Sequence, residues 1–215
     1  MMHTRKFIAV EGPIGVGKTT LARRLAKHYN AELLLEEAEE NPFLERFYQN
    51  PKAAALPTQL FFLFQRTRQL QRARQTDLFT PLRVADYLMD KDRLFARMTL
   101  DDDELRLYEQ VYNQFAFDAP RPDLVIYLQA PVDVLMARIR KRGRKEEELV
   151  ERGYLQKVAD EYAHFFHYYD ESPLLIVNAS GIDLVENDED FAELLMRIEM
   201  THGGRHYFNP KSLHA

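Results

Sequence analysis

A glycine-rich segment near the N-terminus carries residue types that bind phosphate groups. Residues 12–19 read Gly-Pro-Ile-Gly-Val-Gly-Lys-Thr, which fits the pattern G-x-x-x-x-G-K-S/T. Glycine permits backbone angles that point several N–H groups at one anion. The lysine can reach the outer phosphates, and the hydroxyl of the threonine can bind Mg²⁺. An ordinary glycine turn is the alternative, but the pattern favours a site for a nucleoside triphosphate.

The segments on either side of this loop support the phosphate-binding interpretation. An apolar run, Phe7–Val10, precedes the loop, and a stretch with helical spacing, Thr20–Tyr29, follows it. A helix in that place directs the positive end of its dipole at the anion. We therefore expect these residues to contact a bound nucleotide: Gly12, Pro13, Ile14, Gly15, Val16, Gly17, Lys18, Thr19 and Thr20.

Acidic residues follow two further apolar runs. Glu36 and Glu37 come after Leu33–Leu35, and Asp86 ends the run Arg83–Asp86. Ligands of a parallel sheet bind outside the carboxyl ends of its strands, so these carboxylates should face the same crevice as the phosphate loop. Successive side chains of a strand point to opposite faces, so only one of the two glutamates should face the crevice. The residues alone leave open which one, or whether both are solvated loop acids.

A cluster of arginines late in the chain could supply positive charge to a phosphoryl group. Its members, which precede an acidic run at residues 146–148, are Arg138, Arg140, Arg142 and Arg144. Phosphoryl transfer depends mostly on positioning and charge neutralisation, and arginines on a mobile lid can provide both. The alternative is a solvated helix end with ion pairs at helical spacing. Gly143 interrupts the helical pattern and favours the lid.

The elements that must position these residues alternate along the chain. Strands are expected at Lys6–Val10, Leu33–Leu35, Arg83–Asp86, Leu124–Leu128 and Leu174–Val177. Further helices are expected at Pro57–Gln75 (with Pro57 at the helix start), Asp102–Phe117, Val132–Arg142, Glu151–Tyr168 and Glu189–Met200. The alternation predicts an α/β, three-layer fold of the P-loop NTPase type, with a five-stranded parallel sheet, helices on both faces and an arginine-rich lid.

We expect a single domain at residues 1–200, with the lid at about residues 138–150, and a C-terminal tail at residues 201–215. The tail contains Gly203, Gly204 and Pro210, which indicate an extended arm or a poorly ordered segment.

The composition of the 215-residue chain limits its partners. A net charge of −5 argues against a nucleic-acid surface, which would favour basic residues. The chain has no cysteine, which excludes disulfides and thiolate metal sites. No secretory signal fits the N-terminus, and the longest apolar stretch, Leu60–Phe64, is too short to span a membrane. We therefore expect a cytoplasmic protein that binds neither nucleic acid nor membrane.

The absence of two motifs from the sequence narrows the class of phosphate-loop protein. Switch GTPases carry an Asn-Lys-x-Asp segment that reads guanine, and the sequence contains none. Motor-type ATPases usually have an apolar strand that ends in Asp-Glu, and none of the expected strands does so. A small-molecule kinase remains.

Several separated motifs resemble, in order, those of the deoxynucleoside kinases, in particular the bacterial deoxyadenosine/deoxyguanosine kinase branch. The resemblance extends over about Phe7 to Met200. The motifs that carry it are Glu11–Thr20, Glu36–Leu44, Phe47-Tyr48, Gln59 with Arg66, Asp86-Tyr87, and Arg138-Ile139 with Arg142–Glu147. The phosphate loop alone would be weak support, because thymidylate kinases carry a similar loop.

The resemblance implies ATP-dependent phosphorylation of the 5′-hydroxyl of a deoxynucleoside, with a purine base, and Mg²⁺ as the metal. It assigns proton removal to Glu36, counted back from Asn41-Pro42, although Glu37 stands where the family usually has proline. Thr19 and Asp86 would hold the metal. Charge on the transferred group would be neutralised by Lys18, Arg138, Arg142 and Arg144.

The resemblance also assigns residues to the substrate. Tyr48 and Glu147 would hold the 3′-hydroxyl of the sugar, and Gln59 with Arg66 would read the base. Phe191 would stack on the adenine of ATP. Without the resemblance, Gln59 and Arg66 would be interpreted as a polar helix face, and Tyr48 and Phe191 as core aromatic residues.

Three further points follow from the resemblance. Either Asp90 or Asp92 would join the base site. Tyr87 stands where many relatives have arginine, so Lys91 or Arg93 would have to supply the missing charge. A homodimer is also implied.

Two other functions compete with this interpretation. A nucleoside monophosphate kinase of the thymidylate type would share the fold but needs an extra basic site for the acceptor phosphate. A nucleotide-binding module without catalysis would bind ATP and not consume it.

Overall fold

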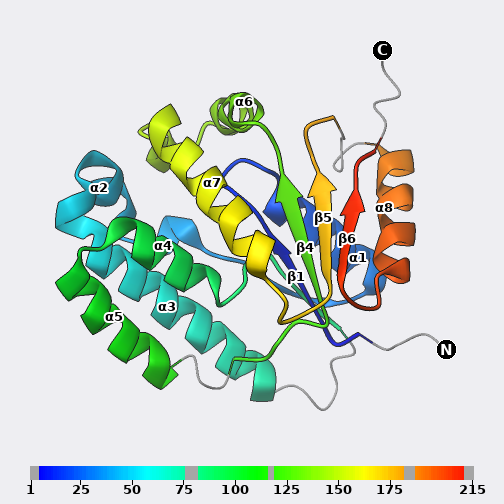
Figure 1. Ribbon diagram of the computed structural model, residues 1–215, viewed down its shortest axis with the longest axis horizontal. Coiled ribbons are helices and arrows are strands. Elements are labelled where there is room, and N and C mark those ends of the chain that lie inside the picture. Colours follow the sequence, from blue (N-terminus) through cyan, green and yellow to red (C-terminus); the bar gives the residue numbers. More distant parts are fainter. Residues whose placement is uncertain (1–4, 76–81, 116–118, 182–186, 211–215) are drawn as a thin grey trace.

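Six parallel strands form the central sheet, as the computed structural model shows (Figure 1). The structure describes residues 5–75, 82–115, 119–181 and 187–210. The strands are β1 (Phe7–Glu11), β2 (Glu32–Leu34), β3 (Arg83–Ala85), β4 (Leu124–Gln129), β5 (Leu174–Asn178) and β6 (Arg205–Phe208). They are ordered β2-β3-β1-β4-β5-β6, and each adjacent pair is parallel. The chain therefore crosses over between strands, as the alternation of strands and helices predicts.

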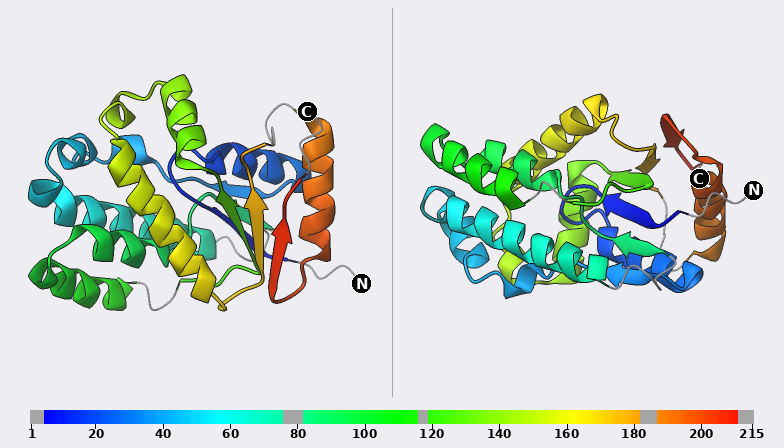
Figure 2. Two further views of the ribbon diagram at one scale, coloured as in Figure 1. Left: turned by 45° about the horizontal axis from the view of Figure 1, so that its top comes forward. Right: turned by 90° about the horizontal axis from the view of Figure 1, so that it is seen from below.

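Helices cover both faces of this sheet (Figure 2). The helices are α1 (Lys18–Tyr29), α2 (Leu44–Gln49), α3 (Pro51–Gln75), α4 (Lys91–Thr99), α5 (Asp102–Phe115), α6 (Val132–Arg142), α7 (Arg152–Tyr168) and α8 (Asp188–Met200). Two short 3₁₀ turns, η1 (Ala38–Glu40) and η2 (Lys145–Glu147), complete the described elements. The three-layer arrangement is confirmed.

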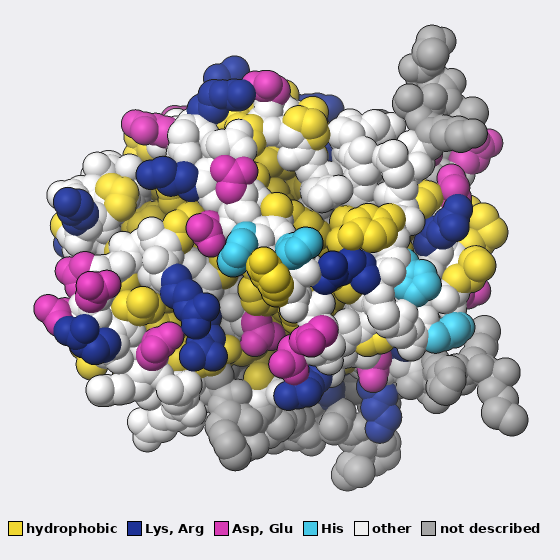
Figure 3. All heavy atoms as spheres, in the orientation of Figure 1, with side chains coloured by type: hydrophobic (Ala, Val, Ile, Leu, Met, Phe, Trp, Pro, Cys, Tyr) yellow, Lys and Arg dark blue, Asp and Glu magenta, His cyan; other side chains and the backbone are white. Residues whose placement is uncertain are grey.

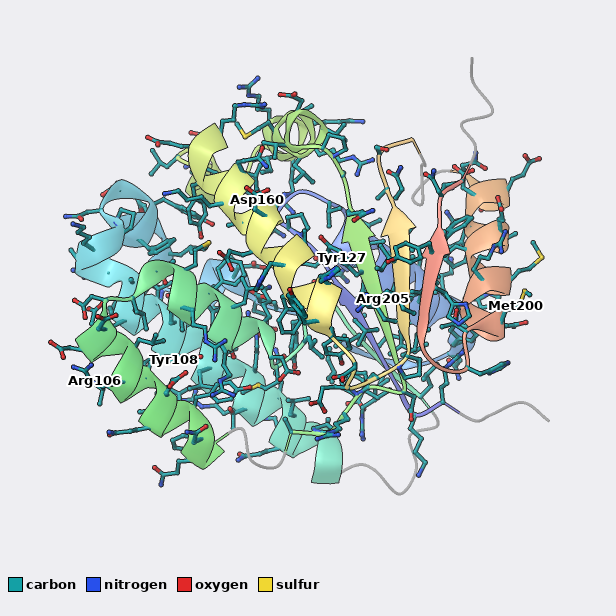
Figure 4. The ribbon with its side chains drawn as sticks, viewed as in Figure 1. Arg106, Tyr108, Tyr127, Asp160, Met200 and Arg205 are labelled. Atoms are coloured by element: carbon teal, nitrogen blue, oxygen red, sulfur yellow. The ribbon has the colours of Figure 1, made fainter. Side chains whose placement is uncertain are left out.

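The alternation of side chains along the strands divides the core between the two faces. Ile126 and Leu128 of β4 pack with α1, α6 and α8 in one cluster. Tyr127 points to the other face, toward α7 (Figure 4), where its ring stacks on Phe166 at a centroid distance of 4.3 Å. Strands buried on both faces need no polar alternation, which explains why their sequences are almost wholly apolar.

The sheet has one strand more than the predicted five. Arg205–Phe208, within the predicted tail, form β6 and pair with β5, with Leu174 opposite Arg205. Only Phe208 of this strand is buried, and it joins the core beside α8. The prediction failed because β6 lies at the edge of the sheet, where three of its four residues are exposed and give no apolar run.

The helices differ from prediction mainly at α3 and in two helices that were not predicted; the starts of α1, α7 and α8 differ by one or two residues. Helix α3 begins at Pro51, and Pro57 lies inside it, not at its start. Proline suits the first turn of a helix, where an N–H has no partner, so Pro51 rather than Pro57 occupies the favoured place. The sequence analysis also missed α2 and α4. Of the predicted helix 102–117, the last two residues lie outside the described part of the chain.

The predicted end of one helix is confirmed. Helix α6 spans Val132–Arg142, and Gly143 ends it with φ 63°, a left-handed conformation that glycine adopts at little cost. In the part of the chain that the structure describes, no helix is long and apolar enough to span a membrane. On the face seen in Figure 3, acidic and basic side chains are interspersed rather than gathered by sign.

The buried ring of Phe208 should hold β6 to the sheet. Phe208 is 3% exposed, whereas its neighbour Tyr207 is 68% exposed. We expect Phe208→Ala to lower the free energy of unfolding by about 3–5 kcal/mol, and Tyr207→Ala to change it by less than about 0.5 kcal/mol. Urea denaturation of the two variants tests this, and equal effects would contradict the role of β6 as an integral strand.

Candidate active site

The loop between β1 and α1 has the backbone conformation expected of a phosphate cradle. Gly12, Gly15 and Gly17 have positive φ angles of 147°, 84° and 108°. A Cβ atom on Gly12 would overlap the Leu128 carbonyl oxygen, and one on Gly15 would lie 2.8 Å from the Leu135 carbonyl oxygen. The first two glycines are therefore required both by their backbone angles and by close packing.

Lys18 lies at the start of α1 and turns back over this loop. Its Nζ donates to the carbonyl oxygens of Gly12 at 2.7 Å and Pro13 at 3.3 Å. The pKa of Lys18 is lowered to about 8, mainly by burial and also by the positive charge of Lys91. An anion bound at this loop would neutralise the buried positive charge of Lys18, so the electrostatics favour phosphate binding.

Asp86 connects three elements at the carboxyl edge of the sheet. It follows β3 and is almost fully buried. Its Oδ2 accepts a hydrogen bond from the Thr19 hydroxyl at 2.5 Å, and its Oδ1 accepts one from the Glu36 backbone N–H at 2.8 Å. The hydroxyl and carboxylate oxygens of Thr19 and Asp86 are the donors that a hard cation such as Mg²⁺ prefers, so the residues present fit the metal.

Glu36, rather than Glu37, faces the pocket. Strand β2 ends at Leu34, so both glutamates lie in the loop that follows. Glu36 Oε2 accepts from Arg66 Nη2 at 2.8 Å and from Lys91 Nζ at 2.7 Å, whereas Glu37 is exposed. Burial alone would raise the pKa of Glu36, but Arg66 and Lys91 outweigh it and hold this pKa far below its usual range.

Arg66 is shared between two carboxylates. One of its nitrogens contacts Glu36 and another forms an ion pair with Asp92, which is fully buried. Asp92 therefore joins the site, while Asp90 lines a separate cavity together with Arg121 and Glu171.

Gln59 completes this side of the pocket. It is 3% exposed, and its amide nitrogen lies 3.5 Å from the Thr99 hydroxyl. Arg66 is 2% exposed, so the alternative of a solvated polar helix face is wrong for both residues.

The lid residues lie at the mouth of the pocket. Arg142 forms an ion pair with Glu147, and Arg144 lies 3.8 Å from Glu39. Tyr48 packs on Phe47 and Tyr154 while it also lines the pocket, so it has both the packing role and the pocket position.

One pocket brings together most of the residues predicted from the sequence. Its lining includes Ile14, Gly15, Lys18, Thr19, Glu36, Tyr48, Gln59, Arg66, Asp86, Arg142, Arg144 and Glu147. The remaining loop residues form the turn behind it and the first residues of α1: Gly12, Pro13, Val16, Gly17 and Thr20.

Two further predicted site residues, outside the phosphate loop, also lie outside this lining. Arg138 donates to the carbonyl oxygens of Val16 at 3.2 Å and Ala179 at 2.7 Å, so it supports the phosphate loop from behind. Phe191 is 7% exposed in the core cluster, with the Arg24 guanidinium 4.1 Å above its ring. Stacking of Phe191 on a nucleotide base stays a prediction.

The sequence analysis missed Glu11 as a positioning residue. Its carboxylate is fully buried and accepts from the Gly12 N–H at 2.9 Å, the Leu88 N–H at 2.7 Å and the Tyr162 hydroxyl at 2.9 Å. It thus joins the phosphate loop to the segment after β3 and to α7. The available signal was an acid that ends an otherwise apolar strand.

The sequence analysis left open whether Lys91 or Arg93 supplies the positive charge that is missing at Tyr87. Lys91 reaches Glu36, while Arg93 lies 3.7 Å from Glu109 and against the ring of Tyr112.

Alanine at position 12 should disrupt the phosphate loop. The added methyl group would meet a backbone oxygen at an unfavourable φ, so we expect Gly12→Ala to lower the free energy of unfolding by about 2–4 kcal/mol. We also expect it to weaken triphosphate binding. The control is Gly153→Ala within α7, where no heavy atom lies within 4 Å of the new Cβ. Urea denaturation should show the control unchanged or slightly stabilised; a harmless Gly12→Ala would contradict the cradle.

Comparisons with known proteins show which family the chain is similar to. The model of the deoxynucleoside kinase family matches residues 8–202. A deoxyguanosine kinase of Bacillus subtilis (strain 168) is 35% identical over 206 residues, which cover 92% of this chain and 98% of the relative. A deoxyguanosine kinase of Lactobacillus johnsonii is 30% identical over 205 residues, 89% of this chain and 90% of the relative.

A solved structure is also similar. Deoxyadenosine kinase from M. mycoides, with the products dCMP and dCDP bound, has a TM-score of 0.78 and 26% identity, over 90% of this chain and 99% of that one. These matches extend over nearly all of the chain and include the pocket residues. The chain belongs to the deoxynucleoside kinase family.

Proposed function

We propose that this kinase transfers the γ-phosphoryl group of ATP to the 5′-hydroxyl of deoxyguanosine or deoxyadenosine. The observation that carries the proposal is a single pocket lined by Lys18 and Thr19 of the phosphate loop and by the carboxylate of Glu36. A phosphate donor and an alcohol acceptor bound there would meet beside a proton acceptor. The purine preference rests on the names of the relatives, which are deoxyguanosine and deoxyadenosine kinases.

The phosphate side of the pocket neutralises charge. Lys18 and the loop N–H groups bind the phosphates, and Arg142 and Arg144 reach the transferring group from the lid. Arg138 acts through the loop that it supports. Thr19 and Asp86 would hold Mg²⁺, which neutralises the charge that develops on the phosphates when it is bound.

The acceptor side orients the nucleoside and removes one proton. Glu36 accepts the proton of the 5′-hydroxyl as that oxygen attacks phosphorus. Tyr48 and Glu147 bind the 3′-hydroxyl, which leaves little room for a 2′-hydroxyl and favours deoxyribose. Gln59 and Arg66, the latter held by Asp92, read the edge of the base; an amide offers a donor and an acceptor together.

Four finer predictions belong to the same proposal. The chain forms one kinase domain with a lid at about residues 138–150, and this domain extends past the predicted end at residue 200, because β6 at Arg205–Phe208 belongs to its sheet. Phe191 packs near the adenine of ATP. The protein acts as a homodimer, and it works in the cytoplasm.

The pairing of the cations favours a nucleoside over a nucleoside monophosphate as acceptor. Arg66 is paired with Glu36 and Asp92, Lys91 with Glu36, and Arg142 with Glu147. A second phosphate on the acceptor would need a basic group of its own, and it would meet the charge of Glu36 instead.

A turnover screen tests the proposed function directly. With Mg-ATP, we expect deoxyguanosine or deoxyadenosine to be converted to its 5′-monophosphate faster than deoxycytidine or thymidine. Thymidine monophosphate should not be phosphorylated. Product formation followed by chromatography measures this. Faster turnover of the monophosphate, or ATP binding without turnover of any nucleoside, would reject the proposal.

Replacement of the carboxylate at position 36 isolates the chemical step. We expect Glu36→Gln to lower kcat by about 10²–10⁴-fold, because the amide cannot accept the proton. The matched control is Glu37→Gln, since this exposed neighbour does not line the pocket. Steady-state kinetics on the preferred deoxynucleoside compare the two. Equal and small effects of both substitutions would remove Glu36 from the mechanism.

A further inference from the structure

Lys91 occupies a position that is unfavourable for a positive charge. It is the first residue of α4, where the helix dipole disfavours cations, and it is only 7% exposed. A buried ammonium is stable only with a close counter-ion. Its Nζ lies 2.7 Å from Glu36 Oε2, and among the described residues Glu36 is the carboxylate that it pairs with.

The two cations on Glu36 both contact the same oxygen. Arg66 Nη2 and Lys91 Nζ lie 2.8 and 2.7 Å from Oε2, while the described residues make no hydrogen bond to Oε1. One oxygen is therefore fixed and the other is open to a hydroxyl in the pocket. This division orients the carboxylate without using the oxygen that a proton acceptor needs.

The two cations are not equivalent. Arg66 divides its charge between Glu36 and Asp92, so part of it is already neutralised. Lys91 has Glu36 alone as its carboxylate partner among the described residues, and its ammonium lies 5.6 Å from the centre of the Phe95 ring. Removal of Lys91 would thus leave Glu36 with only a shared counter-charge.

We propose that Lys91 is a positioning residue for the proposed phosphoryl transfer: it fixes Oε2 of Glu36 and leaves Oε1 for the 5′-hydroxyl. This inference rests on the function proposed above. Helix α4 would then influence the reaction through Lys91 and Glu36. Among the described residues, no other residue of α4 forms a hydrogen bond or ion pair with that carboxylate.

Other charged and titratable groups surround Glu36 from every element packed against it. The cations are Lys18 of α1 and the lid arginines Arg142 and Arg144; the acids are Asp86 and Glu147; the phenols are Tyr48 and Tyr154. Among the described residues, only Arg66 and Lys91 bond to the Glu36 carboxylate, so their removal should displace it most.

Substitution of Lys91 should therefore lower kcat more than it changes KM. We expect Lys91→Met to lower kcat by about 10–100-fold through misplacement of Glu36, with the KM for ATP nearly unchanged. Lys91→Arg can still donate to Glu36 Oε2 and should restore most of kcat. The control is Arg97→Met on the same helix, which is exposed and lies 3.8 Å from Glu109.

A second measurement does not depend on activity. Crystal structures of the wild-type protein and of Lys91→Met show where the Glu36 carboxylate lies. We expect Oε2 to stay at hydrogen-bond distance from Lys91 in the wild-type protein, and the carboxylate to turn away from this position in Lys91→Met.

The outcomes separate the two proposals. A wild-type protein that phosphorylates no deoxynucleoside would reject the proposed function. A wild-type protein that does so, with kcat unchanged in Lys91→Met or with the Glu36 carboxylate in the same position in both crystal structures, would overturn only the role of Lys91.

Discussion

Each charge buried at the carboxyl edge of the sheet needs a partner of opposite sign, and this requirement determines how the site is assembled. Glu36 pairs with Arg66 and Lys91, and Arg66 pairs with Asp92. Burial of an unpaired ion in such a place would cost too much free energy of folding. The four side chains therefore have to be buried together. They come from the β2 loop, α3 and α4, and their pairing fixes these elements around one pocket.

Two further carboxylates join this cluster to the phosphate loop. Asp86 binds the Thr19 hydroxyl and the Glu36 backbone, and Glu11 binds N–H groups on the phosphate loop and after β3. Both lie at strand ends, where the sheet holds them rigidly. The donor and acceptor sides of the proposed reaction are thus built on one scaffold, while Arg142, the last residue of α6, and Arg144 flank Gly143, which ends that helix.

The sequence predicted the parts of the protein that depend on local patterns. The phosphate loop, α6 with its glycine end and the parallel sheet all follow from spacing and composition. Strand β6 was not predicted, because an edge strand shows no apolar run. The predicted start of α3, Pro57, lies six residues after the observed start at Pro51. The sequence could not show whether Asp90 or Asp92 joins the base site. It also could not show whether Lys91 or Arg93 supplies the charge that is missing at Tyr87. Those choices depend on which face of α4 turns toward the pocket. The sequence around the start of α4 does not determine that face.

The account as a whole requires that Glu36 present its open oxygen to the acceptor. The most direct measurement is a crystal structure with a deoxynucleoside and a non-hydrolysable ATP analogue bound. We predict the nucleoside 5′-oxygen at a hydrogen-bond distance of about 2.6–3.2 Å from Glu36 Oε1, with Oε2 still held by Lys91 and Arg66. A Glu36 carboxylate turned away from the 5′-oxygen, or a nucleoside bound elsewhere, would contradict it.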